Sequence, residues 1–238
     1  MKSTFLTAEW RKLALFNYSI DPLILKPFVP YKTELDFWND KCYLSLVGFR
    51  FVNTRLKGLS IPFHSNFEEI NLRFYVRYKD GGTWKRGVVF IKEIVPKSAL
   101  TFVANTIYKE KYVTFPTRHE WLLDGGDMRV SYGWKHKTQW DSIAVTASAT
   151  SIEILAGSEE EFITEHYWGY TQIDDVRTSQ YQVEHPRWQT YSIKGYEVNV
   201  RFGELYGEAF RILENARPDS VMLAEGSPIA VRGAAKIE

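Results

Sequence analysis

The sequence predicts a mainly β protein with a few helices, and three observations support this fold class. Residues 69–78 alternate between polar and apolar side chains, which is the pattern of a strand with two different faces. The pairs Gly81-Gly82 and Gly125-Gly126 mark turns between β-prone segments, and Ile143–Ile154 is rich in Val, Thr and Ile. Aromatic residues make up 16% of the chain, which suits strands and a well-filled core.

The N-terminal part predicts two helices followed by a hairpin. Thr7–Tyr18 has apolar residues at approximately helical spacing, with Thr7 as a cap. Asp21-Pro22 is expected to start a second, short helix that Pro27 and Pro30 end. Glu34–Trp38 and Lys41–Phe51 then predict strands that are joined by a turn at Asn39-Asp40.

The rest of the chain predicts strands with two interruptions. A capping-box arrangement at Ser158–Glu161 predicts a helix with an apolar stripe that includes Phe162 and Ile163. Phe202–Phe210 predicts another short helix, and Trp140-Asp141-Ser142 is expected to be a hairpin turn. The expected strands are Glu69–Tyr78, Gly87–Val95, Leu100–Tyr108, Lys111–Phe115, Met128–Trp140, Ile143–Ile154, Tyr167–Ile173, Ser179–Glu184, Gln189–Val200 and Ser220–Val231.

The chain shows no sign of a domain boundary. It has 238 residues and lacks a Pro/Gly/Ser linker, a low-complexity tract or a repeat. All-β barrels and sandwiches often reach this length as one domain. We therefore expect a single domain over residues 1–238, built as a closed or sandwiched β structure.

Composition argues against several classes of function. Thirty Lys+Arg against 29 Asp+Glu give a net charge of +1, which argues against nucleic acid as a partner. The single cysteine, Cys42, excludes an internal disulfide and a Cys-based zinc site. No apolar run approaches the length of a membrane span, and the N-terminus has no signal-peptide core. These features predict a cytoplasmic protein that does not associate with a membrane.

Motifs for cofactors and metals are missing as well. The five histidines show no metal-binding spacing, and no phosphate-binding loop or nucleophile elbow follows a strand. We therefore expect neither a metal nor a cofactor.

The strand from Glu69 to Arg77 carries the most informative polar side chains. One face holds five polar or half-polar groups, and the other face is wholly apolar. If the polar face lines the lumen of a barrel, Arg73 can clamp a carboxylate while Glu69 compensates its charge. If the same face meets solvent, the strand is an ordinary half-exposed one, and both interpretations remain open. The five groups are Glu69, Asn71, Arg73, Tyr75 and Arg77.

A second group of residues could supply a nucleophile. On a strand, Lys109 and Lys111 would point to one side and Glu110 to the other. Two close ammonium groups lower each other's pKa, and a neutral amine attacks carbonyl carbons. His119 is the next candidate, because it lies beside a carboxylate in the sequence. The alternative interpretation of the lysines is a charged surface loop.

Four motifs in order resemble a known family. They are Phe67-Glu-Glu-Ile-Asn-Leu-Arg-Phe-Tyr-Val-Arg77, Gly87-Val-Val-Phe-Ile-Lys, Glu160-Glu-Phe-Ile-Thr-Glu-His-Tyr167 and Glu184-His-Pro-Arg-Trp188. In this order they resemble the YqjF-like family of uncharacterised conserved bacterial proteins, which is placed in the acetoacetate decarboxylase-like superfamily. The resemblance runs from Trp10 to about Val231.

The resemblance implies an antiparallel β-barrel or cone around a cavity. Acetoacetate decarboxylases form a Schiff base on a lysine beside a second lysine, with a Glu and an Arg in the cavity. The resemblance implies that Lys109 and Lys111 are the two lysines, although Glu110 separates them in this sequence. By strand order, Glu69 and Arg73 are the counterparts of the cavity Glu and Arg.

Together, the residues and the resemblance lead to two hypotheses. In the first, the protein binds a small anionic organic molecule and acts as a decarboxylase-type lyase. Its catalytic candidates are Lys109, Lys111 and Glu69, and its ligand-binding candidates are Arg73, Asn71, Arg77, Tyr75 and His119. In the second, the same barrel is a non-catalytic ligand-binding or protein-interaction module. A homo-oligomer is compatible with both hypotheses. Trp188 is expected to be a buried anchor in either case.

Overall fold

Strands make up most of the chain in the computed structural model, which describes residues 3–107 and 109–238. They are β1 (Thr4–Ser19), β2 (Thr33–Leu35), β3 (Phe37–Trp38), β4 (Lys41–Leu56), β5 (Leu59–Ser60), β6 (Phe67–Asp80), β7 (Thr83–Val95), β8 (Tyr112–Thr114), β9 (Thr117–Asp124), β10 (Asp127–His136), β11 (Gln139–Glu153), β12 (Trp168–Asp174), β13 (Arg177–Glu184), β14 (Gln189–Asn199), β15 (Ser220–Arg232) and β16 (Ala235–Ile237). The helices are α1 (Pro22–Leu25), η1 (Lys26–Phe28), α2 (Ser98–Ile107), α3 (Glu159–Thr164), α4 (Phe202–Tyr206) and η2 (Glu208–Asn215). The mainly β fold class predicted from the sequence is confirmed.

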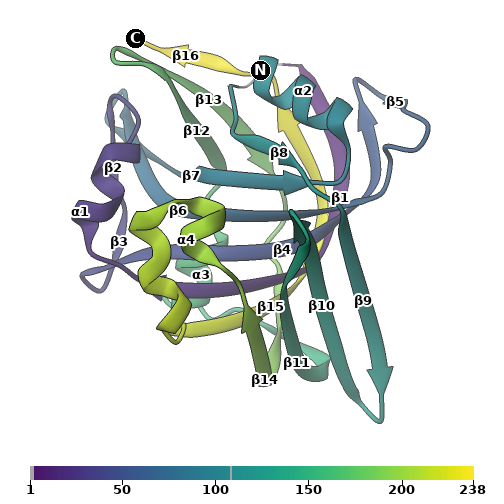
Figure 1. Cartoon of the computed structure of the whole chain (residues 1–238). Coiled ribbons are helices and arrows are strands. Elements are labelled where there is room, and N and C mark those ends of the chain that lie inside the picture. The colour runs from purple at the N-terminus through teal and green to yellow at the C-terminus, as the bar shows by residue number, and fades with distance from the viewer. Residues whose placement is uncertain (1–2, 108) are drawn as a thin grey trace.

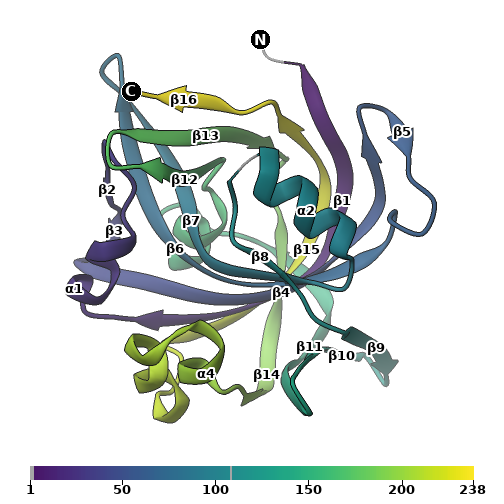
Figure 2. The same cartoon turned by 45° about the horizontal axis from the view of Figure 1, so that its top comes forward.

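The central strands close into a ring. Neighbouring strands pair in the order β13-β12-β7-β6-β4-β1-β15, and β15 also pairs with β13. Most pairings are antiparallel, but β7 pairs in parallel with both β12 and β8. Figure 1 shows the curved strands of the ring, and Figure 2 shows α2 and β8 passing across it. The result is the barrel-like or cone-like sheet that the family resemblance implies.

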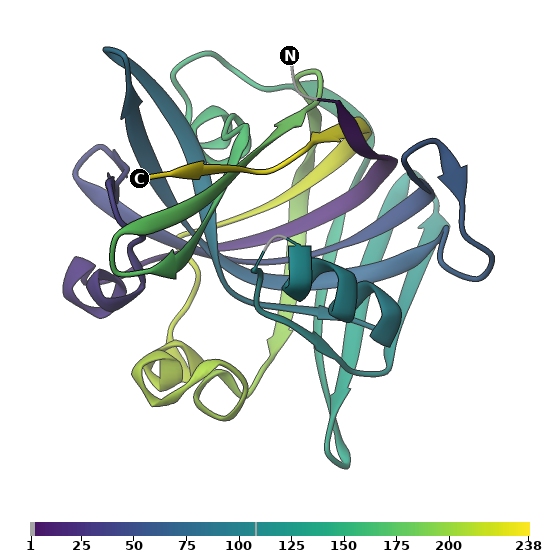
Figure 3. The same ribbon diagram turned by 90° about the horizontal axis from the view of Figure 1, so that it is seen from above.

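The sheet continues beyond the ring and folds back against it. From β15, the order runs through β14, β11, β10 and β9, and these strands lie with α4 on the outer side of the ring (Figure 3). An outer core fills the space between the two layers, with Phe16, Phe74 and Trp134 among its fully buried residues. A separate inner core lies within the ring, where Phe162 of α3 packs against Tyr43 and Tyr75.

The predicted helix over Thr7–Tyr18 is wrong, because this segment is strand β1. The strand pairs with β15 on one side and with β4 on the other. Lys12 has a φ of 53°, and the register with β4 shifts between Arg11 and Ala14. The irregularity breaks the alternation of side chains, and residues 13–16 are all buried between the two cores. A strand that is buried on both faces loses the period of two, which explains the helical spacing.

Three further element predictions differ from the structure. Leu100–Ile107, expected as a strand, belongs to helix α2, while Tyr108 lies outside the described residues. The turn between β10 and β11 is at residues 137–138 rather than at Trp140-Asp141-Ser142, because Lys137 adopts a positive φ without being glycine. The expected helix Phe202–Phe210 is split at Gly207, whose φ is 112°.

Other predictions agree with the structure. Asp21 caps α1 by accepting a hydrogen bond from the Leu23 amide, and Ser158 caps α3 in the same way. β3 and β4 form the expected hairpin around Asn39-Asp40. The apolar face of β6 is buried, as its sequence predicts. If the polar face lined a lumen, the predicted helices Thr7–Tyr18 or Ser158–Tyr167 were expected to cover the apolar face, but the outer layer and α4 cover it instead.

Candidate functional site

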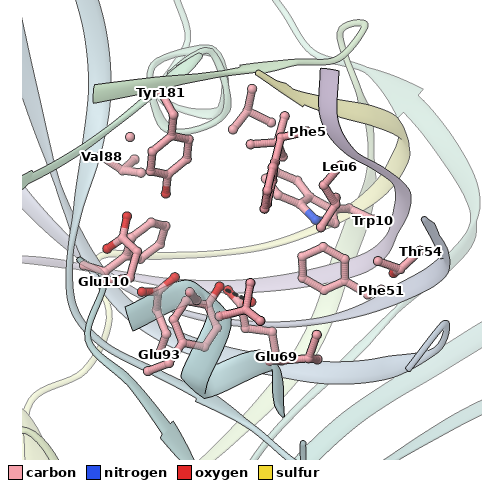
Figure 4. Close-up of a pocket in the computed structure, with 18 of the residues that line it drawn as sticks. Phe5, Leu6, Trp10, Phe51, Thr54, Glu69, Val88, Glu93, Glu110 and Tyr181 are labelled. Atoms are coloured by element: carbon pink, nitrogen blue, oxygen red, sulfur yellow. Dashed lines mark hydrogen bonds between the residues drawn. The ribbon is translucent and has the colours of Figure 1, made fainter. Parts of the chain in front are cut away.

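A cavity of about 230 Å³ opens into the interior of the ring. Its walls come from β1, β4, β6, β7, β12 and β13 and from α2. Figure 4 shows the carboxyl groups of Glu69, Glu93 and Glu110 gathered on one side, across from Leu6, Trp10 and Phe51. A concave, mostly apolar site with a few polar groups is the usual form of a small-molecule site.

Strand β6 supplies Glu69 and Arg73 to the cavity wall. The two residues are four apart, so the alternation of the strand points them to the same side. Asn71 shares this side and donates a hydrogen bond from Nδ2 to Oε1 of Glu69 at 3.0 Å. Tyr75 is fully buried beyond them, and its hydroxyl shares a 2.7 Å hydrogen bond with the Ser45 hydroxyl.

Strand β7 supplies Glu93 because of a bulge. Leu72 faces Lys92 across the pair, whereas Arg73 faces Phe90, so Ile91 is the extra residue. Phe90 and Glu93 therefore both line the cavity, although they are three residues apart. A bulge re-aims side chains in this way, and bulges often occur beside active sites.

The segment after α2 adds Glu110 and Tyr112 to the wall. Tyr112 donates a hydrogen bond from its hydroxyl to Oε2 of Glu69 at 2.9 Å. On the other side of the cluster, the hydroxyl of Tyr181 hydrogen-bonds Glu110. The ring of Tyr181 lies over Gly169, where a Cβ atom would come within 2.2 Å of the ring, so only glycine leaves room for it.

The three carboxyl groups have raised pKa values. Burial raises the pKa of Glu69 and of Glu110 to about 7 in each case, against the effect of their hydrogen bonds. The pKa of Glu93 lies well above its usual range because of burial and then the negative charges of Glu110 and Glu69. At neutral pH the cluster therefore carries protons, which is the condition for a general acid.

Arg73 is a buried guanidinium that has no ion-pair partner in the part of the chain that the structure describes. The residue is 7% exposed, and its Nε has no hydrogen-bond partner among the described residues. No carboxylate oxygen of a described residue lies within 4.0 Å of the guanidinium. Its Cζ lies 5.8 Å from the centre of the Tyr75 ring, which supplies a weak cation–π contact. A buried charge in this state is stabilised by an anion that binds beside it.

Three histidines also line the cavity, namely His64, His166 and His185. Nε2 of His166 donates to Oδ2 of Asp36 at 3.1 Å, and Arg86 donates to the same oxygen at 2.7 Å. Burial lowers the pKa of His166 to about 4, so this side chain is neutral. His185 is stacked on Trp188 with 4.3 Å between the ring centres, and burial lowers its pKa too.

The structure does not bring Lys109 or Lys111 into the cavity. Both residues are exposed, and Lys109 has a φ of 62° in the segment between α2 and β8. Nζ of Lys111 lies 5.5 Å from the centre of the Phe28 ring, on the outer-core side. Glu110, between the two lysines, is the residue that points inward. None of the described residues that line the cavity is a lysine.

Arg77 and His119 also lie away from the cavity. Arg77 is on the same face of β6 but pairs with Glu34 at 2.6 Å and lies over the Trp84 ring. Nδ1 of His119 contacts Oε1 of Glu68 at 2.5 Å. Burial acts to raise the pKa of Glu68, but hydrogen bonds from His119 and Thr117 outweigh it and lower this pKa to about 2. These contacts are structural ones outside the ring.

Sequence reasoning missed Glu93, Glu110 and the histidines of the wall. Glu110 could have been found, because the alternation that puts the two lysines on one side puts Glu110 on the other. Glu93 could not, since simple alternation from Phe90 would place Lys92 on the wall. His166 and His185 occur within the family-like motifs, but nothing in their spacing shows that they meet.

Two absences can be stated for the described part of the chain. No three His, Cys, Asp or Glu side chains among residues 3–107 and 109–238 are arranged to hold a metal ion. Within the same ranges, no helix is both long and apolar enough to cross a membrane.

Several solved structures share the fold. Acetoacetate decarboxylase from Legionella pneumophila subsp. pneumophila str. Philadelphia 1 superposes with a TM-score of 0.67 at 11% identity, covering 99% of this chain and 88% of that one. An acetoacetate decarboxylase-like enzyme from Sphingomonas wittichii RW1 gives 0.68 at 9% identity, covering 99% and 94%. The enduracididine biosynthesis enzyme MppR, complexed with pyruvate, gives 0.68 at 12% identity, covering 100% and 91%. At these identities the similarity shows the fold alone.

The sequence comparisons identify the family. The uncharacterized protein YqjF of Bacillus subtilis (strain 168) is 28% identical over 167 residues, which cover 68% of this chain and 65% of YqjF. The match thus spans slightly less than two thirds of that relative. The DUF2071 family, described as an uncharacterized conserved protein, matches residues 7–228. The resemblance seen in the four motifs is confirmed, and the chain belongs to the DUF2071 family.

Proposed function

We propose that the protein binds a small organic carboxylate in the ring cavity and transfers protons to or from it. The carboxylate of the ligand lies against Arg73, and the carbon beside its carbonyl group lies within reach of the glutamate cluster. One observation carries this proposal: a buried guanidinium with no ion-pair partner among the described residues shares a cavity with three carboxyl groups of raised pKa.

The chemistry follows from these two kinds of group. Arg73 supplies charge-assisted hydrogen bonds that hold and orient the acid. A carboxyl group with a pKa near 7 can give up a proton and take it back at neutral pH. This combination suits proton exchange at the carbon beside a ketone, and a lyase of the decarboxylase type needs the same step to protonate its product.

The proposed mechanism does not use a Schiff base. An imine requires an amine at the reacting carbonyl, and the described cavity wall offers none. The fold shared with enzymes that act on acetoacetate or bind pyruvate supports a keto acid as the ligand, but does not transfer their reaction.

Binding is tested with α-ketohexanoate by isothermal titration calorimetry. We expect Arg73→Met to weaken binding by about 10-fold to 100-fold, the value of a hydrogen bond to a charged group. Arg77→Met is the matched control, because Arg77 lies on the same face of β6 but outside the cavity. Hexan-2-one, in which a methyl group replaces the carboxylate of α-ketohexanoate, is the second control. It should bind the parent as weakly as α-ketohexanoate binds Arg73→Met. Equal binding by the parent and Arg73→Met would refute the proposal.

Proton transfer is tested separately by nuclear magnetic resonance in heavy water. We expect the parent protein to speed the exchange of the protons beside the ketone of α-ketohexanoate. Glu93→Gln and Glu110→Gln should slow this exchange about 100-fold, a usual size for the loss of an acid–base group. Arg73-dependent binding with no exchange would instead support a non-catalytic binding module.

A further inference from the structure

The cavity is polar at its buried end and apolar at its mouth. Arg73 and the three glutamates are all buried, whereas Ile61 at the mouth is 41% exposed. Apart from His64, His185, Tyr112 and Tyr181, the partly exposed lining residues are apolar, and those that the argument uses are Phe5, Leu6, Leu56, Ile61, Leu100 and Val103. A ligand in this cavity therefore meets charge at one end only.

The walls between the two ends are mostly aromatic. The rings of Phe51 and Phe67 stack at 4.7 Å between centres, and Trp10 meets Trp188 edge-on at 6.2 Å. Such surfaces stabilise an apolar body, and a polar group placed against them without a partner would cost free energy.

The volume sets the size of the ligand. A cavity of about 150 Å³ accommodates benzene, so about 230 Å³ corresponds to about nine non-hydrogen atoms. Pyruvate is smaller than this and would leave the apolar mouth in contact with water. An acid that fills the cavity must extend from Arg73 towards α2.

The surface around the mouth of the cavity is also apolar. Leu59 and Phe63 lie on either side of Ile61 in the sequence and are 73% and 88% exposed. On the other side of the mouth, Phe102 of α2 is also exposed. An apolar chain that outgrows the cavity would leave it between these two segments.

We infer that the ligand is a monocarboxylic acid of about six to eight carbons in total with an apolar body, the size class set by the cavity. The acid group lies at Arg73, and the body runs along the aromatic walls to the mouth formed by α2 and residues 57–66. This inference rests on the proposed function for the position of the acid group, and it adds the class of ligand.

The test is a calorimetric titration with acetate, butanoate, hexanoate, octanoate and decanoate. Each methylene that enters the cavity should tighten binding about fourfold, and the gain should fall off beyond octanoate, where the chain reaches the mouth. Equal affinity for butanoate and octanoate would overturn the inference.

A pair of matched variants locates the body of the ligand. Val103→Thr changes the polarity of the mouth with little change of shape, and it should weaken octanoate binding about threefold to tenfold while leaving butanoate unaffected. Val176→Thr makes the same change at an exposed turn and should affect neither acid. Equal octanoate binding by Val103→Thr and the parent would contradict the placement at the mouth.

Arg73→Met separates this inference from the function on which it rests. It should weaken butanoate and octanoate binding by the same factor. If it does so and the gain with chain length is missing, only the ligand class is wrong. If the gain with chain length persists but Arg73→Met has no effect, the position of the acid group and the proposed function are wrong.

Discussion

The two faces of β6 perform different tasks although they alternate along one strand. Ile70, Leu72, Phe74 and Val76 are fully buried in the outer core, where side chains fill the space. On the opposite face, Glu69 and Arg73 border a cavity. The comparison teaches that the same strand can be optimised for packing on one side and for ligand chemistry on the other. Changes on the packed face should affect stability, and changes on the cavity face should affect binding.

The largest effect on stability is expected on the packed face. Phe74→Ala should lower the free energy of unfolding by about 3–5 kcal/mol, because it removes a fully buried ring and leaves a void. Urea denaturation monitored by circular dichroism measures the change. A loss below about 1 kcal/mol would show that the outer core can collapse around the void, and the contrast between the faces would disappear.

Removing a buried ring beside the cavity should lower the free energy of unfolding somewhat less than Phe74→Ala does. Trp188 is buried, as its sequence position predicts, and donates a hydrogen bond from Nε1 to the Ser227 hydroxyl at 2.9 Å. It also borders the existing cavity, so part of its surroundings is already empty. We expect Trp188→Ala to cost about 3 kcal/mol, the lower end of the usual range. If Trp188→Ala lowers the free energy of unfolding more than Phe74→Ala does in the same urea titration, the expected order of the two effects is wrong.

The glutamate cluster predicts a stability that falls as the pH rises. Burial raises the pKa of Glu110 to about 7 from an ordinary value of 4.5, so the folded state favours its protonated form. This contribution is fully present below pH 4.5 and is lost as the pH rises through about 7. His166 opposes the trend below its ordinary pKa, because burial lowers its pKa to about 4.

Glu110→Gln isolates the contribution of one carboxyl group. The decrease in melting temperature between about pH 5 and about pH 8 should be smaller in this variant than in the parent. Glu204→Gln, at an exposed ion pair with Lys137, is the control and should leave the decrease unchanged. Parallel pH profiles for the parent and Glu110→Gln would show that Glu110 does not titrate in this range.

The smallest effect on stability is expected for Arg73→Met. If Glu69 compensated the charge of Arg73, as expected for a face that lines a lumen, removing either partner would break a buried ion pair, which usually costs about 3–5 kcal/mol. In the structure the two groups make no direct ion pair, and Met removes an uncompensated buried charge. We therefore expect a change within about 1 kcal/mol, with the variant equal to or more stable than the parent. Differential scanning calorimetry measures this, and Arg77→Met should lie within about 0.5 kcal/mol of the parent. A loss of several kcal/mol for Arg73→Met would reveal a stabilising role.

The regular strand β6 was predictable from the sequence, and the irregular strand β1 was not. The alternation of residues 69–77 is preserved because β6 lies between β4 and β7 and has no irregularity of its own towards β4. The sequence alone could not decide whether the polar face of this strand lines a lumen or meets solvent, since an alternating pattern fits both equally. β1 was mistaken for a helix because its irregularity at Lys12 and its burial on both faces imitate helical spacing.

The candidate site was predictable only where it lies on a regular strand. Glu69 and Arg73 were found through alternation, and both line the cavity. Glu93 depends on an extra residue in β7, and Glu110 depends on the path of the chain after α2. Both are long-range properties that a local pattern does not contain. The lysines were assigned through their spacing and through the resemblance, and the structure places the carboxyl group of Glu110 where an amine was expected.

The bulge at Ile91 has an evolutionary consequence. Lys92 now donates to the carbonyl oxygen of Leu205 on the outer side of the ring, while Glu93 faces the interior. If the strand after Phe90 slid by one position, the bulge would vanish, and ordinary alternation would turn the amine of Lys92 inward and the carboxyl of Glu93 outward. An acidic cavity and an amine-bearing cavity are therefore separated here by a single step of strand register, with no change of side chain.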